Sequence, residues 1–390
     1  MEEEVVIDGN SLTLGSLVAV ARGLKPVRVP EEVRERLEAN RKVLEGLVGE
    51  GLRCYGINTG LGPLSHLVLE PEEASELQEN LVRSHATGVG PPLPTEVVRA
   101  AMLLRANTLA KGYSGVRPEV LERLIALLNA RAHPVVPSRG SVGASGDLVP
   151  LAHMALALVG DPEGVVELGG RILKADRALR ELGLGRLRLS YKEGLAPVNG
   201  TSFSTAIAAL ATYDSLNLAK TADIALAMSL EAVGGRRAPF DEGYLSLRPF
   251  RGQMACAENV RRLVEGSRLL DHPGLRRAQD PYCLRCAPQV HGAVREAVGF
   301  SKSLIEVELN SADDNPLIFP EGTRCRTGGN FHAQPVALAS DVLAIGLCSL
   351  GNISERRVNF LLKGRENEVL PDFLIPPGGR PGLQSGMMLA

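Results

Sequence analysis

The segment 201–235 constrains the fold of this chain more than any other part of the sequence. It is apolar along most of its length, but Asp214, Lys220 and Asp223 interrupt it. We therefore expect a buried helix or a pair of helices here, and no apolar run elsewhere that is long enough to cross a membrane. Aromatic residues make up only 4% of the chain and Trp is absent, so Leu, Ala and Val must build the core. That composition favours packed helices over a β-sandwich.

Apolar residues at helical spacing predict a mainly α-helical protein. The predicted helices, besides 201–235, are 11–22 (with a Ser as candidate cap), 30–51, 71–88, 94–115, 117–133, 254–268, 287–312 and 332–362. The Gly-rich section 160–200 predicts a small hairpin. We place a boundary between an N-terminal portion, 1–198, and a helical bundle, 199–390. We expect this bundle to be incomplete, because an apolar helical run begins just before Ala390.

Charge and leader signals exclude several classes of protein. The net charge is −2, from 43 basic and 45 acidic residues, so neither a nucleic-acid surface nor a polybasic membrane patch is expected. The first ten residues, MEEEVVIDGN, lack the basic and apolar segments of a secretory signal. Six cysteines in 390 residues do not suggest a disulfide scaffold. We expect a cytoplasmic protein.

Three common kinds of site do not fit the motifs. The sequence GASGD at 143–147 has the wrong spacing for the nucleophile elbow of a serine hydrolase, and no strand is predicted before it. Cys283 and Cys286 form one C-x-x-C, whereas a structural zinc site needs four ligands, so no metal is expected. The glycines form neither a Walker A motif nor G-x-G-x-x-G, which argues against a nucleotide.

The tripeptide Ala144-Ser145-Gly146 offers a different chemistry, in which the backbone cyclises. The amide nitrogen of Gly146 can attack the carbonyl of Ala144 and close a five-membered ring, and only Gly permits so close an approach. The Ser145 hydroxyl leaves as water, and loss of a second water gives a conjugated electrophile. A helix that begins near Leu148 would direct its positive end at that ring. An ordinary turn is the alternative for this tripeptide alone.

The context of the tripeptide resembles the histidine and aromatic amino acid ammonia-lyases. The segment GSVGASGDLVPLAH (140–153) resembles their signature, in which Ala-Ser-Gly matures to 4-methylideneimidazol-5-one (MIO). Further segments agree in chain order: YGINTGLG (55–62), LVRSHATGVG (81–90), LAKGYSGVRPEV (109–120), KEGLAPVNGTS (192–202), QDPYCLRCAPQVHGA (279–293), DNPLIF (314–319) and GGNFHAQPVA (328–337). The resemblance implies an ammonia-lyase/fumarase-like fold and non-oxidative loss of ammonia from an amino acid.

The resemblance also implies roles for individual residues. Tyr55, in a Gly-rich loop suited to act as a lid, corresponds to the base that removes the β-proton. Arg285 corresponds to the anchor of the substrate carboxylate, for which a bidentate guanidinium is suited. The remaining correspondences are Tyr282 and Asn199, which position and polarise the prosthetic group and substrate, and Gln279 and Phe331, which line the pocket. Asp147 is either an aid to cyclisation or a helix N-cap.

Ser84-His85 bears on the choice of substrate. Family members that act on histidine read Ser-His here, whereas an apolar pair suits a phenyl ring. A His can exchange a hydrogen bond with an imidazole, so the resemblance favours L-histidine, converted to urocanate and ammonia. A lyase or 2,3-aminomutase acting on tyrosine or phenylalanine is the alternative enzyme. The alternative to His85 as a ligand is a core histidine at a helix end.

Family members are homotetramers whose active sites draw residues from more than one chain, and the resemblance implies the same assembly here. The early end of the sequence departs from the family pattern. It leaves three alternatives: a fragment, a chain completed by a second polypeptide, or a short form that works alone. A non-catalytic subunit that only stabilises a partner is the non-enzymatic alternative. Retention of Tyr55, Arg285 and the tripeptide argues against that alternative.

Overall fold

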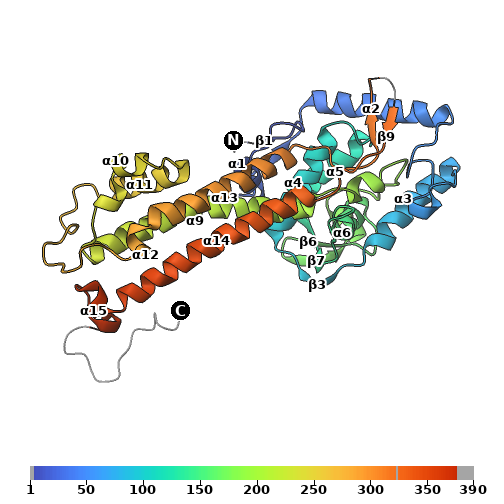
Figure 1. Ribbon diagram of the computed structural model, residues 1–390. Helices are drawn as coiled ribbons and strands as arrows, with labels where there is room; N and C mark the ends of the chain where they lie inside the picture. Colours follow the sequence, from blue (N-terminus) through green and yellow to red (C-terminus); the bar gives the residue numbers. More distant parts are fainter. Residues whose placement is uncertain (1–3, 322–323, 376–390) are drawn as a thin grey trace. The chain divides into compact units, whose positions relative to one another are not determined.

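The chain divides into two compact units in a computed structural model that describes residues 4–321 and 324–375 (Figure 1). The first unit comprises Met1–Leu210 and Leu304–Leu338, and the second comprises Ala211–Ser303 and Ala339–Ala390. The apolar run expected near the end of the sequence lies outside the described residues. The predicted boundary between 198 and 199 remains a prediction based on the resemblance.

Helices of the first unit surround one helix, α4 (Thr95–Ala110), which is buried from its third residue onward. Residues 97–110 of α4 are all buried, as expected for a helix that is covered on every side. Helices α1 and α5 pack on α4, and α3 packs on α6. The bounds of its other helices are α1 (Leu14–Ala21), α2 (Glu31–Gly49), α3 (Pro71–His85), α5 (Pro118–Asn129), α6 (Leu148–Val159), α7 (Ala175–Glu181) and α8 (Leu195–Val198). Thr13, rather than either nearby Ser, is the N-cap of α1.

Short strands support the turns of this unit. The predicted hairpin is confirmed as β6 (Val165–Leu168) and β7 (Arg171–Lys174), which extend an antiparallel sheet from β4 (Ala132–Pro134). The other pairs are β1 (Val5–Val6) with β2 (Val27–Arg28), β3 (Val89–Pro92) with β5 (Pro137–Arg139), and β8 (Leu317–Phe319) with β9 (Arg324–Arg326). The expectation that no strand precedes the tripeptide was wrong. Strand β5 is short and begins with Pro, so its pairing with β3 is not visible in the local pattern.

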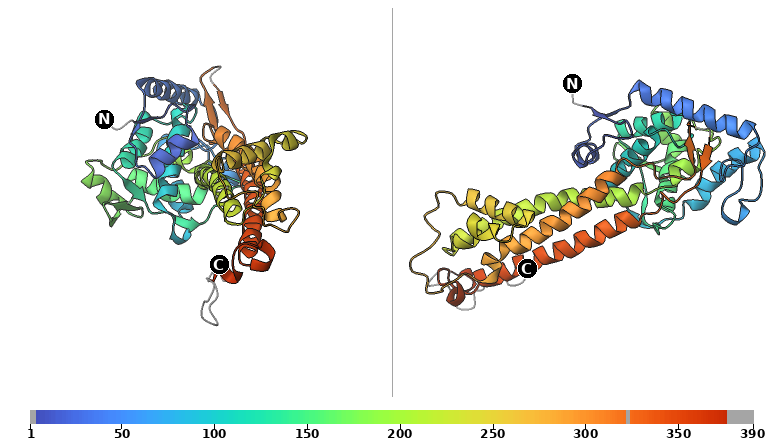
Figure 2. Two further views of the ribbon diagram at one scale, coloured as in Figure 1. Left: turned by 90° about the vertical axis from the view of Figure 1, so that its left-hand side faces the viewer. Right: turned by 45° about the horizontal axis from the view of Figure 1, so that its top comes forward.

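Long helices dominate the second unit. Helices α9 (Ser202–Ala232), α13 (Ala287–Glu308) and α14 (Gln334–Leu361) lie side by side, as Figure 2 shows, and each also contributes residues to the first unit. The segment 201–235 is thus one helix rather than a pair. Residues from α9, α11 (Arg251–Leu263), α13 and α14 share one apolar core, which includes Leu226, Val260, Val294 and Leu343. Helices α10 (Glu242–Ser246), α12 (Tyr282–Arg285) and α15 (Gly364–Asn367) are short.

Helix α14 is long and apolar enough to cross a membrane, by length and composition alone. Its most apolar window has a mean hydropathy of 1.7 and is 33% buried. The expectation that no apolar run reaches this length was therefore wrong. Small polar residues interrupt the apolar residues of α14, but they add no charge and leave its mean hydropathy high. Core helices pass the same test, and Leu343, Leu350 and Ile353 of α14 belong to the apolar core of the second unit.

Candidate active site

A cavity of about 400 Å³ in the first unit brings together residues from distant parts of the sequence. Its lining residues are Tyr55, Leu61, Gly62, Leu81, His85, Ser145, Leu148, Leu195, Asn199, Asn315 and Phe331. Five of these were predicted as site residues: Tyr55, His85, Ser145, Asn199 and Phe331. Asn315 was not predicted, although it lies in the segment DNPLIF. Its position after two aspartates and before a Pro was the signal available in the sequence.

The tripeptide forms a tight turn between β5 and α6. Ala144 and Ser145 are exposed, whereas Gly146 is buried and has a left-handed φ of +77°. A Cβ on Gly146 would lie 2.6 Å from the carbonyl oxygen of Gly200, so no other residue fits. The Gly146 amide donates to the Gly143 carbonyl oxygen at 3.3 Å. Helix α6 begins at Leu148, as predicted, so its positive end lies two residues beyond the turn.

Asp147 holds the turn in place but does not cap the helix through its side chain. It occupies the N-cap position of α6, yet its carboxylate makes no capping hydrogen bond. The carboxylate is buried and accepts hydrogen bonds from the Ser141 hydroxyl at 2.6 Å, the Ser204 hydroxyl at 2.6 Å and the Ser204 amide at 2.7 Å. The Asp147 amide donates to the Gly200 carbonyl oxygen at 2.7 Å. Asp147 thereby joins the tripeptide to the start of α9.

Asn199 directs a donor at the tripeptide. Its side-chain Nδ2 donates to the Ser145 carbonyl oxygen at 3.1 Å. The Asn199 backbone is fixed in turn by Arg105, whose guanidinium donates to the Asn199 carbonyl oxygen at 2.7 Å. Arg105 is fully buried and forms an ion pair with Asp313 at 2.6 Å. Asp313 also accepts from the Thr201 amide at 2.7 Å, so one buried ion pair positions both sides of Asn199.

Sequence reasoning missed Arg105 and Asp313. The signal for Arg105 was present, because it is a charged residue within the apolar run AAMLLRANTLA of a predicted helix. A charge that is buried in such a helix needs a partner. Its partner, more than two hundred residues away, could not be identified from spacing.

The loop after Cys54 holds Tyr55 at the cavity. The Tyr55 hydroxyl oxygen accepts a hydrogen bond from the Gly62 amide at 3.1 Å. The Gln78 side chain donates to the Gly56 carbonyl oxygen at 3.1 Å, which anchors the loop to α3. Gly56 has a φ of +64°, and a Cβ there would lie within 2.8 Å of the Leu61 and Leu195 side chains, so this position next to Tyr55 favours Gly.

His85 ends helix α3 with a defined tautomer. Its Nδ1 lies 2.9 Å from the Leu81 carbonyl oxygen, which can only accept, so the proton of the neutral ring is on Nδ1. The Nε2 atom is then an acceptor. Ser84 is exposed, and its hydroxyl contacts Leu81 and the His85 ring rather than standing free. Ser84 does not line the cavity that contains His85.

Two titratable groups near the site have shifted pKa values. Burial lowers the pKa of His153 on α6 below its usual 6.5, and its Nε2 accepts from the Gly88 amide at 3.0 Å. Burial raises the pKa of Glu308, which accepts a hydrogen bond from the Thr201 hydroxyl at 2.5 Å. Both shifts follow from the cost of charging a buried group.

The other three predicted site residues belong to the second unit. Tyr282 and Arg285 lie on α12, where the Arg285 guanidinium stacks 4.5 Å above the Tyr282 ring. The Arg285 Nε is buried and has no hydrogen-bond partner among the described residues. Tyr282 lines a cavity of about 640 Å³. Gln279 is exposed, in the segment before α12.

Asp223, Cys256 and His291 form a buried cluster in the second unit with the types of ligand that bind metals. Their ligand atoms lie within 4.8 Å of one another. The Asp223 carboxylate, however, already accepts hydrogen bonds from His291 Nδ1, Cys256 and Arg295. Arg357 faces the other ring nitrogen of His291 at 3.3 Å. The guanidinium groups of Arg295 and Arg357 therefore already contact the Asp223 carboxylate and the His291 ring, and their positive charge opposes the binding of a metal cation. We assign no metal to this cluster.

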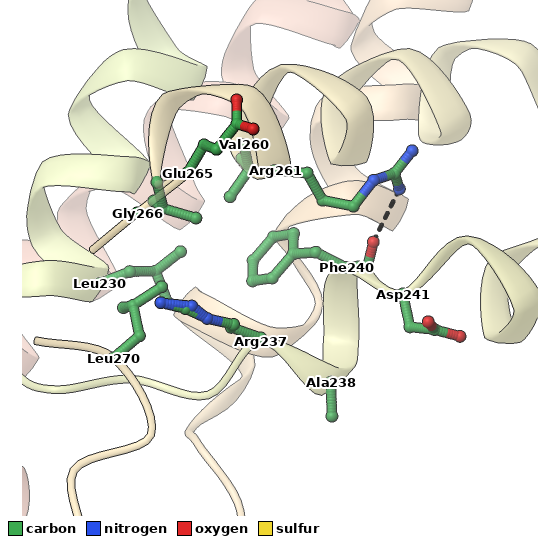
Figure 3. A pocket seen from close by; sticks show the side chains of 11 residues that line it. Leu230, Arg237, Ala238, Phe240, Asp241, Val260, Arg261, Glu265, Gly266 and Leu270 are labelled. Atoms are coloured by element: carbon green, nitrogen blue, oxygen red, sulfur yellow. Dashed lines mark hydrogen bonds between the residues drawn. The ribbon is translucent and has the colours of Figure 1, made fainter. Parts of the chain in front are cut away.

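A smaller cavity of about 280 Å³ in the second unit contains none of the predicted site residues (Figure 3). Phe240, Leu230 and Leu270 form its apolar side. The Arg261 guanidinium donates to the Phe240 carbonyl oxygen at 2.8 Å and thus serves the local backbone.

Comparison with known proteins places the chain in a family. Residues 12–390 match the aromatic amino acid lyase family. A histidine ammonia-lyase of Caldanaerobacter subterraneus subsp. tengcongensis is 48% identical over 388 residues, which cover 100% of this chain and 75% of that protein. A histidine ammonia-lyase of Streptococcus pyogenes is 45% identical over 389 residues, covering 100% of this chain and 74% of that protein.

Solved structures with high similarity to this chain come from related enzymes. Tyrosine aminomutase from Streptomyces globisporus superposes with a TM-score of 0.92 at 39% identity, over 99% of this chain and 76% of that one. Histidine ammonia-lyase from Trypanosoma cruzi gives 0.89 at 39% identity, over 99% and 72%. The protein is therefore a mainly α-helical carbon–nitrogen lyase. It belongs to the aromatic amino acid lyase family, whose members are MIO-dependent enzymes that act on amino acids.

Proposed function

We propose that this protein is a histidine ammonia-lyase, which converts L-histidine to trans-urocanate and ammonia. The observation that carries the proposal is the presence of His85 in one cavity with Tyr55, Ser145 and Asn199. Because Nδ1 of His85 is engaged with Leu81, Nε2 can accept a hydrogen bond from the N–H of a substrate imidazole. The similarity to proteins named histidine ammonia-lyase supports the same substrate.

The residues around Ala144-Ser145-Gly146 suit an MIO group formed from this tripeptide. Gly146 permits the tight turn, and the side-chain amide of Asn199 donates to the Ser145 carbonyl oxygen. When formed, MIO supplies an electrophilic carbon that makes the substrate amine a better leaving group. A donor at the Ser145 oxygen favours negative charge there, and the nearby start of α6 adds to that effect.

Tyr55 is the group we propose to accept the β-proton of the substrate. Its hydroxyl lies at the cavity and must give up its own proton before it can act as a base. The Gly62 amide donates to the Tyr55 oxygen, and this hydrogen bond holds the hydroxyl in a fixed position at the cavity. The proton then passes from the substrate β-carbon to Tyr55 as ammonia departs from the α-carbon.

The remaining roles follow the family pattern. We propose that Arg285 binds the substrate carboxylate through its guanidinium, whose buried Nε has no hydrogen-bond partner among the described residues. We propose that Tyr282, Gln279, Ser84 and Phe331 position the substrate, and that the enzyme is a cytoplasmic homotetramer. Exposed apolar side chains on the long helices support assembly: Met228, Val307 and Ile345 are 66%, 68% and 70% exposed.

A second candidate function is a lyase or 2,3-aminomutase acting on tyrosine or phenylalanine. The favouring observation is the TM-score of 0.92 with tyrosine aminomutase. His85 favours histidine over phenylalanine, because an apolar pair would suit a phenyl ring better.

Two measurements on the purified chain test the proposal. The intact mass should be lower than the sequence mass by two water molecules, and Ser145→Ala, which lacks the leaving hydroxyl, should keep its full mass. Incubation with L-histidine should give urocanate, and L-tyrosine and L-phenylalanine should give far less product. Preference for tyrosine would replace histidine with the second candidate function. A full sequence mass with no turnover would contradict both candidates.

A further inference from the structure

Two cysteines connect the Tyr55 loop to the β8–β9 hairpin. Cys54 directly precedes Tyr55, and Cys325 is the central residue of β9. Cys54 is buried in an apolar cluster with Leu44, Leu47, Ile57 and Ile318, and Cys325 packs against this cluster.

The strand register brings Cys325 to the same side as Cys54. Cys325 lies directly opposite Ile318 in the antiparallel β8–β9 pair, and directly opposed residues point to the same face of a sheet. Ile318 is fully buried in the cluster that contains Cys54. Cys325 therefore packs beside the cluster that contains the Cys54 side chain, and the two thiols influence each other's pKa. Both are free cysteines.

The backbone on both sides of this contact is anchored. The Cys54 amide donates to the Asn58 side-chain oxygen at 2.8 Å, and the Cys54 carbonyl oxygen accepts from the Ile57 amide at 3.1 Å. In β8, the Ile318 amide donates to the Tyr113 carbonyl oxygen at 2.8 Å. The two thiols thus meet on fixed supports rather than on freely moving segments.

Within this pair, Cys54 is the thiol that is favoured as a thiolate. The interaction with Cys325 lowers the pKa of Cys54, whereas Cys54 and burial raise the pKa of Cys325. In contrast, burial raises the pKa of Cys256 and of Cys283, which keeps those thiols protonated.

We propose that Cys54 and Cys325 form a reversible disulfide that fixes the Tyr55 loop to the β8–β9 hairpin, with a peroxide as the oxidant. The Cys54 thiolate attacks one oxygen of hydrogen peroxide, which gives a sulfenic acid and, after protonation, one water. The Cys325 thiol then attacks the Cys54 sulfur and displaces the second water. Two thiols are oxidised, one peroxide is reduced to two waters, and a dithiol reductant reverses the change.

Peptide mapping of the folded wild-type protein tests the bond directly. Trypsin cleaves after Arg53, Arg83, Arg324 and Arg326, so it should release residues 54–83 joined to the dipeptide Cys325-Arg326. This species should appear after peroxide treatment, carry two hydrogens fewer than its parts, and disappear with dithiothreitol. Oxidation of Cys54 to sulfinic acid without the crosslink, or a crosslink from Cys54 to a different cysteine, would overturn the proposal.

Variants add a second measurement. Cys54→Ser and Cys325→Ser should each lose the crosslink, and Cys54→Ala serves if the buried serine impairs folding. Cys348→Ser is the matched control, because Cys348 is exposed and lies on α14. The control should retain the crosslink.

The effect on turnover rests on the proposed function, whereas formation of the bond does not. The oxidised enzyme should lose activity about tenfold with L-histidine, as expected when a lid is held in one position. Dithiothreitol should restore it, and the Cys54→Ser enzyme, which lacks the thiolate that attacks peroxide, should resist peroxide. Full activity in the crosslinked protein would overturn the proposal that the disulfide controls the Tyr55 loop. If the reduced enzyme had no lyase activity, the proposed function would be contradicted. Peptide mapping would still show whether the Cys54–Cys325 disulfide forms.

Discussion

At the scale of single residues, the proposed proton transfer depends on one atom, the hydroxyl oxygen of Tyr55. Tyr55→Phe removes the hydroxyl that the Gly62 amide contacts at 3.1 Å and leaves the ring that lines the cavity. We expect kcat to fall by about 10² to 10⁴, the usual contribution of a general base. Steady-state kinetics with L-histidine measure this change.

The control for Tyr55→Phe is the mass of the variant. Cyclisation of the tripeptide does not need the Tyr55 hydroxyl, so the variant should still be lighter than its sequence by two waters. Near-normal kcat in a correctly matured variant would rule out Tyr55 as the base. Loss of the mass change would instead show that Tyr55 acts in maturation.

The buried side chain of His153 leads to a prediction on how the stability of the fold depends on pH. Burial lowers its pKa below the usual 6.5, so the unfolded chain binds a proton more readily than the folded one. The contribution of His153 to stability is present above about pH 6.5 and is lost as the pH falls towards the folded pKa. Burial lowers the pKa of His133 in the same way. The urea midpoint should therefore decrease between about pH 7 and pH 5.

His153→Gln isolates the share of one residue in this pH dependence. A glutamine oxygen can accept from the Gly88 amide as Nε2 of His153 does, but it does not titrate. The variant should show a shallower loss of stability on acidification, with His133 supplying the rest. An unchanged pH profile would show that His153 makes no such contribution.

Asn199 is held in position by contacts between secondary-structure elements rather than by a single residue. The Arg105–Asp313 ion pair connects α4 to the segment before β8 and clamps the backbone of Asn199. Asp313→Asn leaves the Arg105 charge buried without its partner, which costs about 3 to 5 kcal/mol in such pairs. We also expect kcat to fall, because the donor to Ser145 loses its fixed position. Urea denaturation and steady-state kinetics measure the two effects.

Asp176→Asn is the matched control for Asp313→Asn. It breaks an ion pair with Arg180, whose side chain is 68% exposed, within one helix. Exposed pairs contribute about 0 to 1 kcal/mol, so the control should be close to wild type in stability and activity. Equal effects of the two substitutions would contradict the clamp.

The elements show what the sequence could and could not predict. Helix α6 and its start at Leu148 follow from a run of good helix formers after a Gly-rich turn. The role of Asp147 does not, because its partner Ser204 comes from a different helix. Local periodicity specifies which face of a helix is apolar, whereas pairings such as Arg105 with Asp313 depend on tertiary contacts. The site residues themselves came from motif resemblance, and the cavity unites five of them, all from the first unit.

At the scale of the whole molecule, the proposed tetramer with shared sites predicts complementation between inactive variants. Tyr55→Phe should lack the base and Arg285→Ala the carboxylate anchor, so each alone should be nearly inactive. If one site takes Tyr55 and Arg285 from different chains, random mixing of equal amounts gives about a quarter of the sites both intact residues. We expect activity to recover to about that fraction after the two proteins are dissociated and reassembled together, as measured with L-histidine. Each variant carried alone through the same cycle is the control, and native mass spectrometry verifies that mixed oligomers form. Mixed oligomers without recovery would mean that both residues act within one chain, and the shared site would then have to be abandoned.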